Sequence, residues 1–342
     1  MNLRQITFAA LLIILAGFVS ACGSRLPDDC PPECIGESLF GKDLNNIDMS
    51  SALLMDADLR EAELVEANLS GANLSSARLV EAKLESADLN QAILVGADLA
   101  GANLRNVQMG NADLRGASFR GSSLVRVDFS TALMAGISFV RAELIGSVLQ
   151  GVNLSGVQIY EADLSGANLK DSNLSGAALS LSNFNGAEMQ KVNLSGAWLN
   201  LSSLVGSNLN QADLSGSTMF AADLTGANLS GAKLNGAGLI GANLSGVDLR
   251  GADLTGAQLQ LPMPADAGPD FSYSDLTGDE FLRALLLQTN LAKVANDPAE
   301  LSLNETQLKP LLKDAMLQGV VYNEDTIWPL GFKIPDSAVL RP

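Results

Sequence analysis

A five-residue period runs through most of this chain and limits the folds that it can adopt. Every fifth residue from Leu39 to Leu259 is Leu, Met, Phe or Ile, which makes 45 consecutive positions without an insertion. From Ala52 to Ala257 the residue two places before each of them is Ala, Ser or Val, with the single exception of Ile137. An α-helix spreads positions five apart by ~140° around its axis, and a straight strand sends them to opposite faces. The chain must therefore change direction once per repeat.

The residues around the two inward positions show where the direction changes. They are rich in Asn, Asp, Ser and Gly, which form strands poorly and turns well. Four turns close a square, so residues 20 apart lie above one another and each coil pairs its backbone with the next. The 45 repeats then give about eleven coils of four pentapeptides. The pattern predicts an all-β solenoid whose narrow core is filled by alternating large and small side chains.

One corner of this square carries glycine at every coil over a long stretch. A type II turn needs a positive φ at its third residue, where glycine is the least costly choice. We therefore predict type II turns throughout this corner, at Gly96, Gly116, Gly136, Gly156, Gly176, Gly196, Gly216, Gly236 and Gly256. A uniform polar ladder runs beside it, which we interpret as solvated turn chemistry: Asn153, Asn173, Asn193, Ser155, Ser175, Ser195 and Ser215.

The repeats also resemble a known family. Segments such as Ala72-Asn73-Leu74-Ser75 and Ala222-Asp223-Leu224-Thr225-Gly226 are similar to the A-(D/N)-L-x-x signature of pentapeptide-repeat proteins. The resemblance covers about two thirds of the chain, and an uninterrupted run of this length is a specific signal. It implies a right-handed quadrilateral β-helix over residues 39–261.

The N-terminal residues are typical of a bacterial export signal. Residues 1–21 hold one basic residue, Arg4, followed by an apolar run from Ile6 to Val19 that is too short to span a bilayer. Val19-Ser20-Ala21-Cys22 resembles a lipobox, which implies lipidation of Cys22 and an extracytoplasmic protein anchored to a membrane. In a two-membrane bacterium, the residues after Cys22 favour the outer membrane, because the aspartate that resembles a retention signal is absent.

Residues 22–38 are expected to form a tether and an N-terminal cap. They contain Cys30 and Cys34, which we pair as a disulfide because an exported protein occupies an oxidising compartment. A metal site is the alternative, but two thiols without any histidine provide too few ligands. No metal and no cofactor is therefore predicted.

The repeat stops after Leu261. Residues 262–276 are a Pro- and Asp-rich linker, and residues 277–342 are predicted to be a small α-helical C-terminal cap and a tail. Thr277-Gly278-Asp279-Glu280 resembles a capping box, and a second helix is expected from Pro310 to Gly319. A cap is expected because the end of a solenoid exposes unpaired backbone groups. The tail Tyr322–Phe332 has no role that the residues themselves indicate.

Composition excludes several kinds of enzyme. The chain has no histidine, so Ser-His-Asp and Cys-His machinery and His-ligated metals are absent. Carboxylate chemistry of the kind used by polysaccharide-active β-helix enzymes is the remaining possibility. The outward charges favour a structural interpretation, because neighbouring rungs alternate in sign: Asp58, Arg78 and Asp98; Asp213, Lys233 and Asp253; Glu63 and Lys83. The like-charged pairs Glu61/Glu81 and Asp43/Glu63 are exceptions. We predict no catalytic residues and no small-molecule substrate.

Two kinds of binding function remain. Some members of the family that the chain resembles mimic B-form DNA and occupy enzymes such as gyrase, so the resemblance implies this function as one possibility. The export signal argues against this, as do the 23 acidic and 13 basic residues of positions 37–260, a thin charge for a DNA mimic. A net charge of −17 also argues against nucleic acid as a partner. We therefore expect a rigid, lipid-anchored interaction or structural module of the cell envelope.

One group of outward residues breaks the polar pattern. A contiguous apolar surface on a polar rod commonly marks a contact site, and Trp and Tyr are favoured anchors. We define this group as the apolar patch and predict that its six side chains share one face: Tyr160, Leu181, Trp198, Leu201, Phe220 and Ile240. Its occupant is expected to be either an external protein or the chain's own helices at residues 277–319, through Phe281, Leu285 and Leu286.

Overall fold

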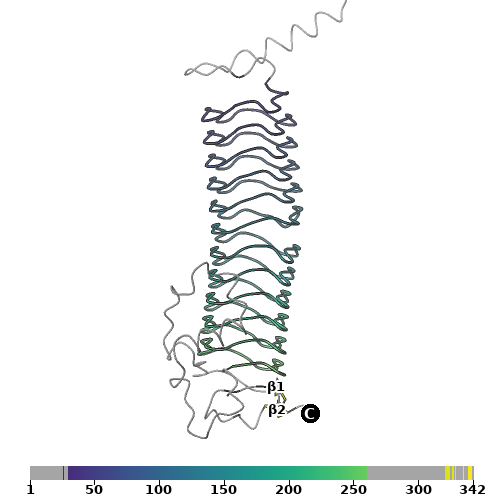
Figure 1. Ribbon diagram of the computed structural model, residues 1–342, viewed down its shortest axis with the longest axis vertical. Coiled ribbons are helices and arrows are strands. Elements are labelled where there is room, and N and C mark those ends of the chain that lie inside the picture. Colours follow the sequence, from purple (N-terminus) through teal and green to yellow (C-terminus); the bar gives the residue numbers. More distant parts are fainter. Residues whose placement is uncertain are drawn as a thin grey trace, which may run out of the picture.

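Residues 30–259 form a long stack of similar coils in the computed structural model (Figure 1). The structure also describes Leu26 and, near the C-terminus, residues 320–323, 326, 328, 334 and 338–340. A turn occurs every five residues, and parallel β-bridges join residues 20 apart. Each coil therefore has four sides and four corners, as the period predicted.

The backbone ladder between coils is the same on every side. Each outward residue at the centre of a side pairs with the residue 20 positions later, from Glu33–Leu53 to Gly238–Gln258, with the single exception of Leu133. On one side, for example, the N–H of Leu59 donates to the carbonyl of Arg78 at 2.8 Å, and the N–H of Arg78 donates to Ala57 at 2.9 Å. The ladder thereby satisfies backbone groups that a buried chain cannot leave unpaired.

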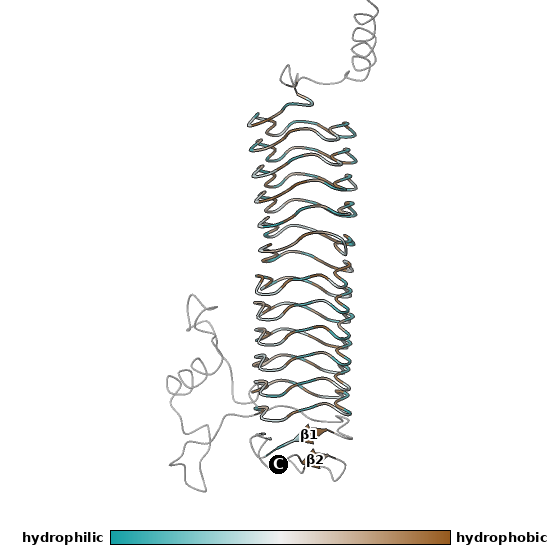
Figure 2. Cartoon of the chain, turned by 90° about the vertical axis from the view of Figure 1, so that its right-hand side faces the viewer, coloured by the Kyte–Doolittle hydropathy of each residue, from teal (hydrophilic) through white to brown (hydrophobic). Residues whose placement is uncertain are grey.

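The core is the column of large residues together with the column of small ones. Leu164 and Ala167 are typical, with 0 % of each residue exposed. Figure 2 shows the resulting alternation of hydrophobic and hydrophilic residues along the coils. Phenylalanine replaces leucine in the middle of the stack, where the rings of Phe119 and Phe129 each lie within 5.7 Å of the Phe139 ring. Each buried Leu contributes ~1.5–3 kcal/mol, so the stack is held by many similar increments.

The corners have the positive φ that a type II turn requires. The predicted glycine column is confirmed, with φ between 63° and 71° at Gly216 and Gly136 and intermediate values at its other members. The prediction was too narrow, however, because the other three corners adopt the same conformation with residues such as Glu66 (57°) and Asp171 (57°). The ladder fixes these corners at every coil except at Thr131, and it can therefore hold a non-glycine residue in a region that is otherwise sparsely populated.

Thr131 marks the one place in residues 30–259 where the ladder of bridges is interrupted. A β-branched residue tolerates positive φ poorly, and Thr131 is not among the positive-φ residues. Its hydroxyl instead accepts the N–H of Asn111 at 2.9 Å. Two residues later, Leu133 bridges Asp113 on one side but not Asn153 on the other, and Leu133 is 55 % exposed. We attribute the interruption to this altered turn.

The C-terminal end of the stack is covered by strands in the part that the structure describes. Strand β1 (Val321–Tyr322) pairs in parallel with β2 (Val339–Leu340), and Val321 bridges Asp253 of the last coil. Val321 thus takes the place of the residue 20 positions after Asp253, although it lies 68 positions later. The expectation of an α-helical C-terminal cap needs correction here, because the described residues contain no α-helix and the cap they form is a continuation of the ladder. The predicted helices within residues 277–319 lie outside the described residues.

Part of the tail strengthens this cap. The Thr326 hydroxyl donates to the carbonyl of Leu254 at 2.8 Å and accepts the N–H of Gly256 at 3.1 Å. The Asn323 side chain accepts the same N–H at 2.9 Å. Tyr322 and Trp328 pack edge to face, with ring centroids 5.7 Å apart. These residues give the tail a structural role that the sequence pattern did not indicate.

We predict that Leu164→Asp destabilises the protein far more than Asp163→Lys. Leu164 is fully buried among apolar residues, so a carboxylate there lacks a partner and costs about 4 kcal/mol or more. Asp163 points outward and accepts the N–H of Ser165 at 2.9 Å, so its replacement costs about 1 kcal/mol. Thermal unfolding of the two variants followed by circular dichroism measures the difference. Equal melting temperatures would show that the inward register is wrong.

Candidate interaction surface

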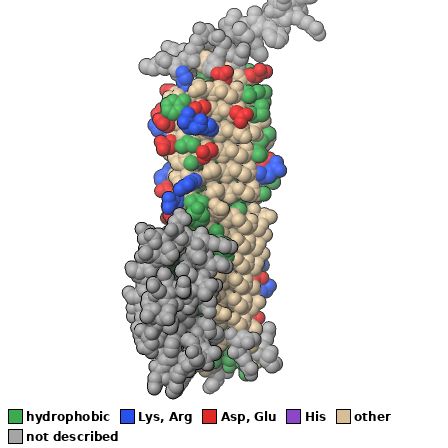
Figure 3. All heavy atoms as spheres, viewed as in Figure 1, with side chains coloured by type: hydrophobic (Ala, Val, Ile, Leu, Met, Phe, Trp, Pro, Cys, Tyr) green, Lys and Arg blue, Asp and Glu red, His purple; other side chains and the backbone are tan. Residues whose placement is uncertain are grey.

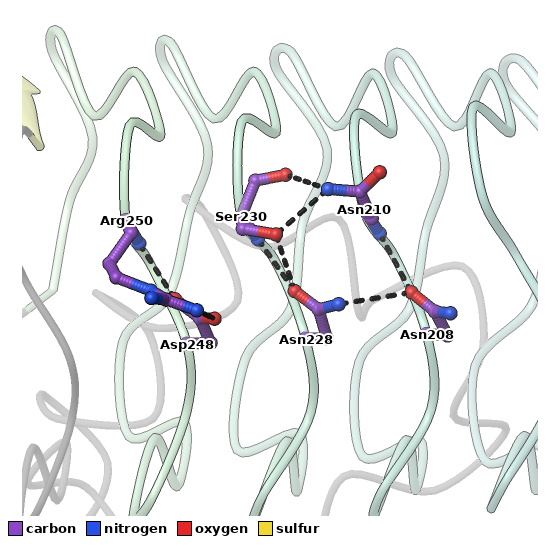
Figure 4. Close-up of polar contacts among 6 residues, drawn as sticks. All are labelled: Asn208, Asn210, Asn228, Ser230, Asp248 and Arg250. Atoms are coloured by element: carbon purple, nitrogen blue, oxygen red, sulfur yellow. Dashed lines mark hydrogen bonds and ion pairs between the residues drawn. The ribbon is translucent and has the colours of Figure 1, made fainter.

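The outer surface is dominated by Asp and Asn side chains that close the turns. Each Asp or Asn at the bridging position between Asp43 and Asp253 accepts the backbone N–H two residues later, at 2.8–3.4 Å. This is an Asx-turn, which occupies an N–H at the corner that the ladder does not use. Figure 4 shows three consecutive examples, beginning at Asn208, Asn228 and Asp248. The recurring D/N of the repeat is therefore explained by the turn.

A second device serves turns that lack this residue. Where Glu63 stands at the bridging position, the side chain of Asn45 in the preceding coil accepts the N–H of Val65 at 2.8 Å. Three further turn N–H groups are satisfied by an asparagine of the preceding coil in the same way. Gly110 donates to Asn90, Val205 to Asn185 and Phe220 to Asn200. These asparagines therefore support the fold and are not free polar groups awaiting a ligand.

Two of the ion pairs predicted between neighbouring coils are present. Lys83 lies 2.6 Å from Glu63, and Lys233 lies 3.3 Å from Asp213. On the face drawn in Figure 3, charged side chains of both signs gather over the N-terminal part of the coils. Such exposed pairs contribute little individually.

The predicted pairing of Asp58 with Arg78 is only partly right. The two residues are bridged in the ladder, but the guanidinium of Arg60 forms the ion pair, with Nη2 2.6 Å from Oδ2 and Nε 2.7 Å from Oδ1 of Asp58. Arg115 and Arg250 bind Asp113 and Asp248 in the same two-pronged way. A residue two positions later lies on the same corner, so it reaches the carboxylate more easily than a residue in the next coil.

These contacts lower the pKa of the carboxyl groups involved. The Arg60 guanidinium is the main reason that the pKa of Asp58 lies below its ordinary value, and Arg115 and Arg250 lower the pKa of Asp113 and Asp248 in the same way. The pKa of Glu63 is lowered by hydrogen bonds from Lys83 and Asn45. All four groups are therefore held ionised, which suits a structural ion pair better than a general acid.

Neither like-charged pair forms an isolated carboxylate site. Asp43 bridges Glu63, but Glu63 is occupied by Lys83 and by Asn45, whose Nδ2 lies 3.3 Å away. Glu61 and Glu81 are both turn residues with positive φ. Within the described residues, no group of three Asp, Glu, Cys or His side chains is arranged to hold a metal ion.

The apolar patch does come together at one corner. Tyr160, Phe220 and Ile240 directly follow inward residues of the same column. The other three members lie on the two coils between Tyr160 and Phe220, within two positions of the equivalent residues 180 and 200: Leu181, Trp198 and Leu201. Its exposure is uneven, since Leu181 is 46 % exposed whereas Phe220 and Ile240 are 1 % and 3 % exposed. The C-terminal end of the patch is therefore buried. The expected cover, residues 277–319, lies outside the described residues.

Of the three N-terminal cysteines for which a role was predicted, the structure describes Cys30 and Cys34. Cys30 and Cys34 form a disulfide, with Cα atoms 4.9 Å apart, and both residues are buried at the start of the core. Pro32, between them, accepts the N–H of Leu53 at 2.8 Å, which joins this cap to the first coil. Cys22 lies outside the described residues. Of the residues that were described, none forms a helix of the length and hydrophobicity needed to cross a membrane.

A family model matches the residues that form the coils. The model for pentapeptide repeats matches in eight copies, over residues 52–91, 82–121, 122–159, 162–200, 199–236 and 232–260. These segments make up more than half of the chain. The chain belongs to the pentapeptide-repeat family. Members of this family fold as right-handed quadrilateral β-helices and are generally structural or interaction modules without enzymatic activity.

Several solved pentapeptide-repeat proteins are similar to this one. HetL from the cyanobacterium Nostoc, which is involved in the regulation of heterocyst differentiation, is 30% identical over 75% of this chain and 96% of its own, with a TM-score of 0.32. A protein of the Arabidopsis thaliana thylakoid lumen is 33% identical over 32% of this chain and 66% of its own, with a TM-score of 0.23. Full-length QnrB1, a plasmid-mediated fluoroquinolone resistance protein, is 16% identical over 56% and 90%, with a TM-score of 0.38. No curated protein matches the chain.

The paired carboxylates predict how the stability of this pentapeptide-repeat protein depends on pH. A carboxyl whose pKa is lower in the folded state stabilises the fold above its unfolded pKa, and this contribution is lost as the pH falls through the folded value. The ordinary pKa of Asp is 3.8, so the loss should begin near this value and continue below it. We expect the triple variant Asp58→Asn, Asp113→Asn and Asp248→Asn to show a smaller fall in melting temperature than wild type between about pH 5 and pH 3.

Asparagine is the matched replacement because its Oδ1 can still accept the turn N–H. The experiment therefore removes the charge and keeps the Asx-turn. A second triple variant, Arg60→Gln, Arg115→Gln and Arg250→Gln, should flatten the same acid transition by removing the cation instead. A transition as steep as that of wild type in both variants would contradict the assignment of these ion pairs.

Proposed function

We propose that this protein is a non-enzymatic, lipid-anchored interaction or structural module of the bacterial cell envelope. The observation that carries the proposal is the use of the outer polar groups. The outward Asp and Asn side chains close turns, and the acids with lowered pKa values are ionised and paired, as Asp248 is with Arg250. A surface built in this way is suited to presenting a repeated, rigid face to a partner.

The sequence supports the location in this proposal. The apolar run from Ile6 to Val19 is followed directly by Ser20-Ala21-Cys22, the arrangement that resembles a lipobox. The paired Cys30 and Cys34 suit an oxidising compartment. A lipid at Cys22 would leave a short segment before the first coil, so that the solenoid would stand close to the membrane. In a bacterium with two membranes, the outer membrane is favoured.

A DNA-mimic function has weaker support. The acids of the coils are interspersed with Arg and Lys, and several are paired within the same coil or with the next, as Glu63 is with Lys83. A phosphate-like stripe needs unneutralised charge at regular spacing. A polysaccharide-active enzyme is also less well supported, because it needs an acid with a raised pKa opposite a second carboxylate.

We predict that Cys22→Ala abolishes acylation and releases the protein from membranes. Cells that express tagged wild type, Cys22→Ala or Ser24→Ala are labelled with a fatty-acid analogue and fractionated. Wild type and Ser24→Ala should be labelled and sediment with membranes, whereas Cys22→Ala should be unlabelled and soluble or retained as precursor. Equal label in Cys22→Ala and wild type would refute the anchor. Cross-linking of the tagged wild type in the same fractions identifies its neighbours.

A further inference from the structure

The corner that carries the apolar patch, here called the patch corner, differs from the other three in the burial of its turn residues. The turn residue that directly follows each large inward residue is half-buried or exposed at every described coil of those three corners. At the patch corner it is buried at Ser180, Asn200, Phe220 and Ile240 in four successive coils, as it is earlier at Val140. The third turn residue of the last of these coils, Gly241, is buried as well.

The coils themselves do not account for this difference. Apart from the turn at Thr131, the four corners share one turn conformation and one pattern of hydrogen bonds to the neighbouring coils. The residues concerned also differ in size, since Ser180 is small and Phe220 is large, yet both are 1 % exposed. The burial of the large side chains Phe220 and Ile240 in particular points to a cover from outside residues 30–259, along about four rungs or ~19 Å.

The register of the chain shows which segment is in position to do so. Gln258 bridges Gly238 on the side that leads into the patch corner, so the described part of the stack ends at Leu259, one coil beyond Leu239 and next to this corner. The chain returns to the ladder at Val321, which bridges Asp253. Bridged residues elsewhere in the stack are 20 positions apart, whereas Asp253 and Val321 are 68 apart. The repeat is therefore interrupted by 48 additional residues.

We propose that residues 260–319 pack along the patch corner as an intramolecular cover for Phe220, Ile240 and Trp198. The segment begins at this corner, and it is long enough to reach Ser180, since ~19 Å requires only about six extended residues. It carries apolar side chains suited to an apolar surface, including Phe271, Phe281, Leu285 and Leu286. Because it is tethered at both ends, its effective concentration at the patch is in the millimolar range, which favours it over a separate protein.

This inference goes beyond the proposed function and does not depend on the lipid anchor. It assigns the buried end of the apolar patch to the chain itself. Leu181, which is 46 % exposed, lies at the other end, farther from the point where the segment leaves the stack. An external partner would therefore meet the N-terminal coils and the rim of the patch, whereas Phe220 and Ile240 would remain covered.

Site-specific cross-linking tests the proposal in the full-length chain. A photoreactive phenylalanine analogue is placed at position 220, and in a control at position 170, the equivalent turn position of an exposed corner, where Lys170 now stands. Position 220 should cross-link within one chain to peptides from residues 260–319, and position 170 should not. Cross-links from position 220 to a second copy, seen as a product of twice the chain's mass, or to no peptide of residues 260–319, would overturn the proposal.

Thiol labelling gives a second readout that tolerates failure of one variant. Phe220→Cys, Ile240→Cys and Lys170→Cys are each labelled with a maleimide in the native protein, with the denatured protein as the reference for complete reaction. The thiols at positions 220 and 240 should react at least about tenfold more slowly than the one at position 170, because a covered thiol must wait for local opening. Equal rates at all three positions in a variant with an unchanged melting temperature would refute the cover.

Discussion

The hydrogen bonds between residues 20 apart are the interaction on which the rest of this protein depends. They use backbone N–H and C=O groups on all four sides of each coil, so the coils repeat with one geometry regardless of which outward side chain is present. The inward positions are then fixed in two columns, one large and one small, which explains why five residues are the repeat and why no insertion occurs between Leu39 and Leu259. The positive φ at the corners, held even at Leu181 and Lys191, is a consequence of the same constraint.

The ladder leaves one N–H at each corner to be satisfied by a side chain, and this requirement determines most of the outer surface. Asp and Asn at the bridging position meet it locally, and a few asparagines meet it from the preceding coil. Several carboxylates are also paired with arginine or lysine in the same coil or a neighbouring one, as Asp248 is with Arg250 and Glu63 with Lys83. Such a surface is uniform and already satisfied. A departure from it, such as the apolar patch, is therefore more informative here than in a protein with an irregular surface.

The two ends of the stack are treated differently. At the N-terminal end, a disulfide between Cys30 and Cys34 closes a short segment. The carbonyl of Pro32 within this segment accepts the N–H of Leu53. At the C-terminal end, the described coils end at Leu259, and the ladder is extended by Val321 and then Val339. The side chains of Asn323 and Thr326 satisfy groups of the last coil. Both devices limit the open backbone edge that would otherwise invite end-to-end association.

The sequence alone determined the period, the inward register, the four-sided coil and the positive φ of the glycine column, because each follows from a pattern repeated 45 times at fixed spacing. It also brought the six residues of the apolar patch to one corner. Tertiary structure decided what a local pattern does not encode. Thr131 interrupts the ladder because its branched side chain disfavours the turn that its neighbours adopt, and Asp58 pairs with Arg60 because the nearer guanidinium reaches it first. The return of Val321 to the ladder, 68 residues after Asp253, joins segments across a break in the repeat, and a periodicity has no information beyond the point at which it ends.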